Sequence, residues 1–253
     1  MPTDRFATVT IGGLPIAVVN RLDAAAWMIE RAGSHPRGTR PLYLTSANGE
    51  VIARTRADAE FRQQFLGADQ ILADGQPMVF ISRLRCHKPL PERVATTDLF
   101  HDVARLAEET GHSFYFLGAT EEENRRAVAE VRKLYPRLKI AGAANGYLNA
   151  DALSAKLAEI DALAPDILWL AMGVPYEQRF VAVHADALPN VGMIKTSGGL
   201  FNFLSGRNSR APKWMQDAGL EWLYRLVLEP RRLFWRYLVT NPIALWQMLC
   251  YSE

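Results

Sequence analysis

The sequence lacks the features that would place it in an oxidising compartment or across a bilayer. Its 253 residues include two cysteines, Cys86 and Cys250, which lie far apart and show no metal-ligand spacing. They cannot build a disulfide framework, so we expect a reducing compartment. No run of 18 or more apolar residues predicts a membrane-spanning helix. The first residues also do not resemble a secretory signal. We therefore expect a cytoplasmic protein, either soluble or lying on a membrane surface.

Several motifs of nucleotide and metal chemistry are also missing. Neither G-x-G-x-x-G nor G-x-x-x-x-G-K-[ST] follows a strand-like run, so both common phosphate-binding loops are absent. No two aspartates lie two residues apart, and the five histidines form no ligand spacing. We therefore predict no metal site and no cofactor, which argues against a nucleotide-dependent oxidoreductase. A formal net charge of +2 is too small to make the whole chain a nucleic-acid binder.

The residues that are present are typical of a globular α/β protein. Apolar residues make up 49% of the chain and charged residues 22%. Residues 7–19, ATVTIGGLPIAVV, predict a hairpin, because Gly12-Gly13 suits the positive φ of a tight turn. Afterwards, short β-rich runs alternate with helical patterns, which predicts an α/β fold with a mainly parallel sheet. The predicted strands span residues 41–45, 70–73, 113–118, 166–172 and 191–197.

Polar residues mark where several helices should begin. Asp23 precedes one helical pattern, and Thr97 or Asp98 precedes the segment LFHDVARLAEET. The segment from Thr120 to Glu123 has the form of a capping box. These start signals predict helices between the strands, as parallel strands require.

Polar residues and glycines follow the predicted strands. In an open α/β sheet, ligands bind in the crevice beyond the carboxyl ends of the strands. Asp74, in ILADGQPMV, is a candidate general base, because a carboxylate can accept a proton from a substrate hydroxyl. Structural roles remain open, since Asp74 suits an Asp-Gly turn, Asn48 suits a helix cap and GVPYEQ suits a helix start. The strand-end residues are Thr45, Ser46, Asn48, Asp74, Gly75, Gly118, Gly173, Glu177, Gln178, Ser197, Gly198 and Gly199.

The stretch SGGLFNFLSG, residues 197–206, is the best local candidate for a phosphate site. Its glycine pair follows a predicted strand and opens a short helical pattern. Backbone N–H groups at such a position can hold phosphate oxygens.

The composition changes near Arg207. From there onward the chain has seven Arg or Lys residues, four Asp or Glu residues and four of its six tryptophans. Apolar residues recur at helical spacing before Pro230, which should end one helix so that a second begins near Arg231. We therefore divide the chain into an α/β core, residues 1–206, and a helical C-terminal appendage, residues 207–253.

Two interpretations of this appendage compete. It could be a helical pair packed on the core with a solvated basic face. Aromatic rings interleaved with arginines, however, are typical of the membrane interface, and arginine pairs well with phosphate. A membrane surface or a lipid-linked phosphate is therefore the favoured partner. Single-stranded nucleic acid would fit the composition, but no nucleic-acid-binding motif accompanies it.

Several stretches together resemble the bacterial WecG/TagA/CpsF glycosyltransferases. They are ADGQPMV, PERVATTDLF, FYFLGAT, PDILWLAMGVPYEQRFV and SGGLFNFLSGRNSRAPKWMQDAGLEWLYRLVLEPRRLFWRYL. The resemblance runs from about residue 42 to residue 238. It implies a Rossmann-like core and an inverting, metal-independent transfer from a UDP-sugar. It also implies an undecaprenyl-diphosphate-linked acceptor, the inner face of the cell membrane and surface or exopolysaccharide synthesis.

The resemblance also implies roles for particular residues. Asp74 matches the family's catalytic base, and Arg93 in PERV matches a pocket arginine. Thr45 or Ser46, together with Asn48, matches its polar pocket. Matches to the donor side and candidates for the phosphate groups are Glu177, Gln178, Ser197, Gly198, Gly199, Arg207, Arg210, Arg225, Arg231, Arg232 and Arg236.

Departures from the family pattern leave the donor open. Glu177 stands at the usual glutamine position, Asn202 stands where aspartate is common, and PERVATTD differs from the usual form. The donor could be of the UDP-N-acetylmannosamine type or the UDP-glucose type. A non-catalytic membrane-surface assembly protein of the same fold is the alternative. Relatives also imply self-association away from the membrane.

Overall fold

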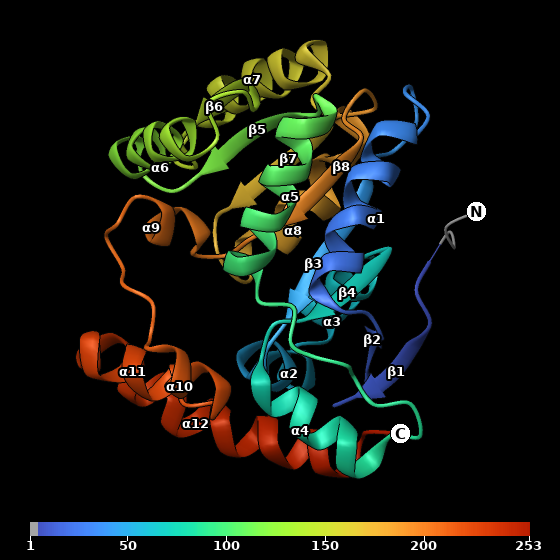
Figure 1. Cartoon of the computed structure of the whole chain (residues 1–253), viewed down its shortest axis with the longest axis vertical. Helices are drawn as coiled ribbons and strands as arrows, with labels where there is room; N and C mark the ends of the chain where they lie inside the picture. Colours follow the sequence, from blue (N-terminus) through green and yellow to red (C-terminus); the bar gives the residue numbers. More distant parts are fainter. Residues whose placement is uncertain (1–4) are drawn as a thin grey trace.

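A parallel six-stranded sheet forms the centre of the protein, which we describe from a computed structural model covering residues 5–253 (Figure 1). For Arg232 only the backbone is described. The strand order is β4-β3-β8-β7-β5-β6, and every neighbouring pair is parallel. This confirms the predicted fold class. The strands are β3 (Leu42–Ala47), β4 (Gln70–Ala73), β5 (Ser113–Gly118), β6 (Lys139–Ala144), β7 (Ile167–Ala171) and β8 (Met193–Thr196).

Strand β6 was missing from the sequence prediction. Its sequence, KIAGAA, contains only one β-branched residue, and none of its residues is buried. Strand β6 lies at the edge of the sheet, paired only with β5. A strand held by one partner and little burial leaves no strong pattern in the sequence.

Two layers of helices cover the sheet, and alternate strand residues point to each layer. Phe114, Phe116 and Trp169 join the core that includes α1, α5, α6 and α9, the face toward the viewer in Figure 1. Tyr115 and Leu168 join the core on the opposite face, with α7 and α8. The helices are α1 (Arg21–Ser34), α5 (Thr96–Thr110), α6 (Glu121–Leu134), α9 (Leu200–Leu204), α7 (Ala150–Leu163), α8 (Tyr176–His184) and the short 3-10 helix η1 (Ala185–Ala187).

A third apolar cluster joins the two ends of the chain. It contains side chains from the N-terminal hairpin and from α2, α3, α4 and the C-terminal helix α12 (Pro230–Cys250). The hairpin turns at Gly12 and Gly13, whose φ angles are 59° and 78°, as the sequence predicted. The elements are β1 (Thr8–Ile11), β2 (Leu14–Ala17), α2 (Gly49–Ala57), α3 (Ala59–Leu66) and α4 (Gln76–Arg85).

The predicted helix starts were correct in part. Thr120 and Glu123 form the expected capping box. Asn20, rather than Asp23, caps α1, and its side chain accepts a hydrogen bond from the Asp23 N–H. Helix α5 begins at Thr96, so neither Thr97 nor Asp98 caps it. Asp98 is therefore available for a tertiary contact described below.

The C-terminal helices lie across the carboxyl-end side of the sheet. They are α10 (Lys213–Asp217), α11 (Glu221–Leu228) and α12 (Pro230–Cys250), so Pro230 separates two helices as predicted. Helix α12 packs along α2, at the bottom of Figure 1. After it, Glu253 and Thr10 exchange backbone hydrogen bonds of 3.0 and 3.1 Å. Within residues 5–253, no helix combines the length and apolar character needed to cross a membrane.

Candidate active site

Asp74 lies at the carboxyl end of the sheet, immediately after β4. Its backbone N–H donates to the Ala47 carbonyl at 2.8 Å, which ties it to the end of β3. The Thr96 hydroxyl, at the first turn of α5, donates to Asp74 Oδ2 at 3.1 Å. Asp74 is partly exposed as a residue, and it lines two cavities. Among residues 5–253, the Thr96 hydroxyl makes the one side-chain hydrogen bond to Asp74, and no ion pair closes this carboxyl group off.

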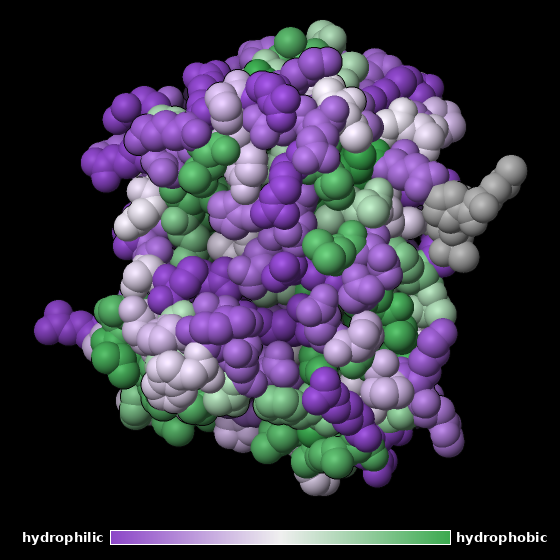
Figure 2. Space-filling model, in the orientation of Figure 1, coloured by the Kyte–Doolittle hydropathy of each residue, from purple (hydrophilic) through white to green (hydrophobic). Residues whose placement is uncertain are grey.

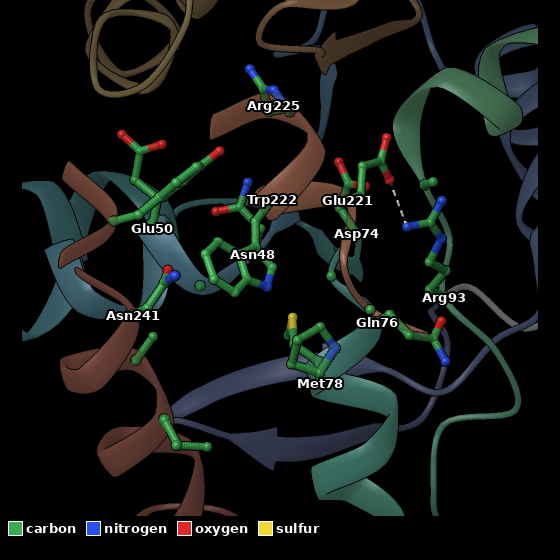
Figure 3. A pocket seen from close by; sticks show the side chains of 18 of the residues that line it. Asn48, Glu50, Asp74, Gln76, Met78, Arg93, Glu221, Trp222, Arg225 and Asn241 are labelled. Atoms are coloured by element: carbon green, nitrogen blue, oxygen red, sulfur yellow. Dashed lines mark hydrogen bonds and ion pairs between the residues drawn. The ribbon is translucent and has the colours of Figure 1, made fainter. Parts of the chain in front are cut away.

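Two cavities meet at Asp74. The larger, about 350 Å³, lies between the strand ends and the C-terminal helices, and Figure 3 shows residues that line it. The smaller, about 120 Å³, lies against the ends of β3 and β8 and the glycine pair. The residues that line both are Asn48, Asp74, Thr97, Phe203 and Arg225.

The two cavities differ in chemistry. The smaller one is bordered largely by hydroxyl groups, an amide, carboxylates and the glycine pair. The larger one combines arginines with an apolar wall that includes Met78 of α4, Trp222 of α11, and Leu245 and Met248 of α12. Asp74 therefore faces a cavity rich in hydrogen-bonding groups on one side and a more apolar cavity on the other.

Glu177 and Lys195 are buried charged residues beside the smaller cavity. Glu177 is 3% exposed and Lys195 is 0% exposed. Burial raises the pKa of Glu177 and lowers the pKa of Lys195 to about 8, with the charges of Asp74 and Glu177 opposing the change at the lysine. Burial likewise raises the pKa of Asp74, against the attraction of Arg93 and Lys195. The strand ends thus hold two carboxyl groups around one ammonium group.

The glycine pair offers fewer free N–H groups than the sequence predicted. The Gly198 N–H donates to Glu177 Oε2 at 2.9 Å, and the Ser197 N–H donates to the Leu170 carbonyl at 2.8 Å. Among the described residues, Gly199 is the only one of the three whose N–H has no acceptor. The turn is therefore pinned by Glu177, and one backbone donor remains for a ligand.

Arg93 and Arg210 are held together by one carboxylate from the appendage. Glu221 of α11 accepts from Arg93 Nη1 at 2.8 Å, the pair drawn in Figure 3, and from Arg210 Nε at 3.2 Å. Gln216 Oε1 accepts from both arginines at 2.8 Å. Arg210 also pairs with Asp98 at 3.1 Å. This network fastens α10 and α11 over the larger cavity.

The remaining arginines separate into two groups. Arg225 lines both cavities, with its guanidinium over the Phe203 ring, and Arg236 lines the larger cavity while pairing with Glu50 at 3.1 Å. Arg207 is exposed, pairs with Glu123 of α6 and lines neither cavity. Arg231 is exposed and also lines neither. The side chain of Arg232 is outside the described residues.

The polar residues of β3 and α8 take different positions. Thr45 and Ser46 lie within β3, which extends to Ala47 rather than ending at residue 45. Thr45 is 0% exposed and accepts a hydrogen bond from Thr196, whereas Ser46 lines the smaller cavity. Asn48 caps α2, the structural role left open above, and also lines both cavities. Gln178 is 0% exposed, and its amide N–H donates a hydrogen bond to Glu177 Oε1.

Sequence reasoning missed Lys195, Thr96 and Glu221. A lysine inside the apolar run VGMIKTS was the available signal for Lys195, because a charge in a buried strand is unusual. No local pattern marks Thr96 or Glu221, since both reach the site through contacts with distant segments. Among residues 5–253, no three His, Cys, Asp or Glu side chains gather where they could hold a metal ion.

Known proteins are similar in sequence to this chain over most of its length. A model of the glycosyl transferase WecG/TagA/CpsF family matches residues 9–252. An N-acetylglucosaminyldiphosphoundecaprenol N-acetyl-beta-D-mannosaminyltransferase from Bacillus subtilis (strain 168) is 31% identical, over 79% of this chain and 75% of its own. The enzyme of the same name from Bacillus spizizenii (strain ATCC 23059 / NRRL B-14472 / W23) is 29% identical, over 88% of this chain and 87% of its own.

Proposed function

The chain belongs to the WecG/TagA/CpsF family of glycosyl transferases, and from this premise we propose that it moves a hexose from a UDP-sugar to a sugar carried on undecaprenyl diphosphate. The observation that carries the proposal is the position of Asp74 at the junction of two unlike cavities. A transferase needs a donor and an acceptor on either side of one proton-accepting group. The names of both relatives describe transfer to a diphosphoundecaprenol-linked sugar.

The smaller cavity is the donor side of this proposal. Its hydroxyl groups and the Asn48 amide can hydrogen-bond sugar hydroxyls, and Arg225 and the Gly199 N–H can face the diphosphate. Glu177 holds the turn that presents Gly199. The donor is of the UDP-N-acetylmannosamine type or the UDP-glucose type, and the relatives' names favour the former.

The larger cavity is the acceptor side. Arg225 and Arg236 can pair with a diphosphate, and the apolar wall of α4, α11 and α12 suits the start of an isoprenoid chain. Fourteen of the twenty-three large hydrophobic side chains that are exposed in residues 5–253 lie between Trp214 and Tyr251. Such a surface, with arginines nearby, suits the inner face of the cell membrane, where a lipid-linked acceptor would be met.

The proposed reaction is a single displacement. The acceptor hydroxyl oxygen attacks the anomeric carbon, and its proton passes to the Asp74 carboxylate. The bond from the anomeric carbon to the UDP oxygen breaks, and its electron pair leaves with UDP. Arg225 stabilises the charge that grows on the leaving group. One displacement inverts the anomeric centre, and in this scheme arginines supply the positive charge without a metal.

UDP release tests the proposal directly. The purified chain is mixed with a panel of UDP-hexoses and a short-chain prenyl-diphosphate-linked N-acetylglucosamine, and both UDP and the glycosylated lipid are quantified with and without EDTA. We expect equimolar UDP and product with one donor, unaffected by EDTA. No release with any donor would favour the non-catalytic assembly protein. UDP without glycosylated lipid would indicate hydrolysis and contradict the acceptor assignment.

A further inference from the structure

Lys195 is a fully buried lysine in the middle of the sheet, next to the junction of the two cavities. Its Nζ donates to Ser46 Oγ and to the Thr196 carbonyl, both at 2.8 Å. Neither acceptor carries a charge. An ammonium group removed from water is destabilised by several kcal/mol unless opposite charges and hydrogen bonds compensate. A lysine kept at this position therefore calls for carboxylates close by, and those are Asp74 and Glu177.

A chain of hydroxyl groups connects Lys195 to Asp74. Ser46 Oγ and Thr96 Oγ1 are 3.2 Å apart, and Thr96 Oγ1 is 3.1 Å from Asp74 Oδ2. An ionised carboxylate only accepts hydrogen bonds, so the single hydroxyl hydrogen of Thr96 goes to Asp74. The Thr96 oxygen is then left to accept from Ser46, whose own oxygen accepts from Lys195. With Asp74 ionised, Ser46 and Thr96 each accept one hydrogen bond and donate one, so the chain runs from Lys195 to the carboxylate.

We propose that Lys195 is a positioning residue for the base: its charge and the Ser46–Thr96 chain hold the Asp74 carboxylate ionised, with Oδ2 fixed and Oδ1 left for the acceptor hydroxyl. This inference rests on the proposed role of Asp74. Without the lysine, burial would favour the protonated carboxyl group, which cannot take a proton.

The other charged groups near Asp74 cannot replace this cation fully. Arg93 lowers the pKa of Asp74 more than Lys195 does, but its guanidinium is already bound by Glu221, whose own charge raises that pKa. Arg210 is divided between Asp98 and Glu221. Glu177, on the α8 side, attracts the same ammonium group.

Two further groups complete the surroundings. Arg225 faces the junction from α11 and is available to a ligand there. The buried Tyr43 phenol of β3 stays neutral, because burial raises its pKa. Lys195 is thus a buried cation of β8 whose hydrogen-bond acceptors within residues 5–253, the Ser46 hydroxyl and the Thr196 carbonyl, are both neutral.

The pH dependence of kcat/KM tests the inference. Lys195→Met removes the charge with little change in length, while Lys195→Arg keeps the charge. We expect the acidic limb of the Met variant to move to higher pH by about one to three units, the range that a neighbouring opposite charge produces. Activity lost at low pH should return as the pH rises. Lys195→Arg should move the limb back toward that of the unmodified protein.

Two outcomes overturn the inference. One is a folded Lys195→Met protein whose acidic limb stays in place. The other is a uniform loss at every pH, which would indicate a structural role only. If the Met variant does not fold, Ser46→Ala and Thr96→Val decide, because they keep the cation and cut the hydroxyl chain. An acidic limb that moves to higher pH in both variants, by less than one to three units, supports the inference. An acidic limb that stays in place in both variants contradicts it.

Asp74→Asn in the same assay separates this inference from the proposed function. If Asp74→Asn keeps its turnover, Asp74 is not the base and the proposed function loses its mechanism. If Asp74→Asn is inactive while Lys195→Met shows an unmoved acidic limb, only the role of Lys195 fails.

Discussion

The strand ends and the C-terminal helices both depart from the usual pattern of apolar residues inside and charged residues outside, and they do so in opposite ways. At the strand ends, charged groups are inside: Glu177 and Lys195 are both below 4% exposed. On the C-terminal helices, apolar groups are outside: Trp214, Trp235 and Trp246 are each more than 60% exposed. In Figure 2 the hydrophobic side chains gather along the lower edge, over these helices. Ordinarily charged side chains avoid the core, and large exposed apolar patches are rare.

Each reversal has a physical consequence that points to function. A buried charge destabilises the fold unless it is compensated, so it marks a site where a perturbed group is used. An exposed apolar patch leaves favourable burial unrealised, so it is typical of a surface that binds a partner. Glu221 joins the two regions, because it belongs to α11 and binds Arg93 and Arg210 at the cavity. The buried charged groups at the strand ends and the exposed apolar helices are thus fastened to each other.

The largest effect should come from the strand ends. Asp74→Asn removes the proposed base while keeping the size of the side chain, so turnover should fall by about 10²- to 10⁴-fold. Binding of the UDP-sugar, followed by thermal shift, should remain. The matched control is Asp186→Asn, the same change at a side chain that is 89% exposed and outside both cavities. Near-normal turnover in Asp74→Asn would break the assignment of chemistry to the strand ends.

The next largest effect should come from the arginines that line the cavities. Arg225→Gln should lower kcat/KM by about 10- to 100-fold, because Arg225 lines both cavities and a hydrogen bond to a charged group contributes about 1.5–3 kcal/mol. Arg207→Gln should change kcat/KM by less than about twofold, since an exposed ion pair contributes little. Steady-state kinetics on the lipid-linked acceptor measures both. Equal losses in the two variants would contradict the division of the arginines by cavity.

The apolar surface should control association with lipid. Replacing Trp235 or Trp246 by serine should weaken binding to anionic liposomes by about 10- to 100-fold each, because burying an apolar ring contributes roughly 1.5–3 kcal/mol. Sedimentation with vesicles measures this, and turnover of a water-soluble short-chain acceptor should be retained. Tyr147→Ser is the control, since Tyr147 is 80% exposed but lies outside the appendage. Unchanged sedimentation of the double tryptophan variant would remove the membrane assignment.

The link between the two regions should affect stability rather than turnover. Glu221→Ala leaves Arg93 and Arg210 without their shared carboxylate, so the free energy of unfolding should fall by about 1–3 kcal/mol. A thermal melt should show a loss of several degrees. Asp217→Ala removes the exposed Lys213–Asp217 pair of the same appendage and should leave the melting temperature within about one degree. Equal melting temperatures for the two variants would show that Glu221 does not fasten α11 to the core.

Much of the fold could be predicted because its signals are local. The glycine pair of the hairpin, the capping box at Thr120 and the break at Pro230 each depend on a few adjacent residues, and each occurs as predicted. Asn20 caps α1 instead of the predicted Asp23, although both residue types suit a helix start. Strand β6 lacked a pattern altogether.

The candidate site was predictable only in outline. Residues after strands were expected to converge, and Asp74, Asn48 and Ser46 do line a common cavity. The sequence could not show that the Gly198 N–H is already hydrogen-bonded to Glu177. It also could not show that Arg207 pairs with Glu123 of α6, whereas Arg225 lines the cavities. Spacing along the chain places a residue on an element, but the packing of elements decides which partner it meets.

The sequence by itself determined the parallel sheet, the position of Asp74 after a strand and the aromatic basic appendage, because hydrophobic periodicity and turn chemistry act over a few residues. Only the tertiary structure decided that Lys195 lies against Ser46, 149 residues away, and that Glu221 closes on Arg93, 128 residues away. Parallel strands bring distant segments to one edge, and there the low-dielectric surroundings give each charge an influence on its neighbours that sequence distance does not reveal.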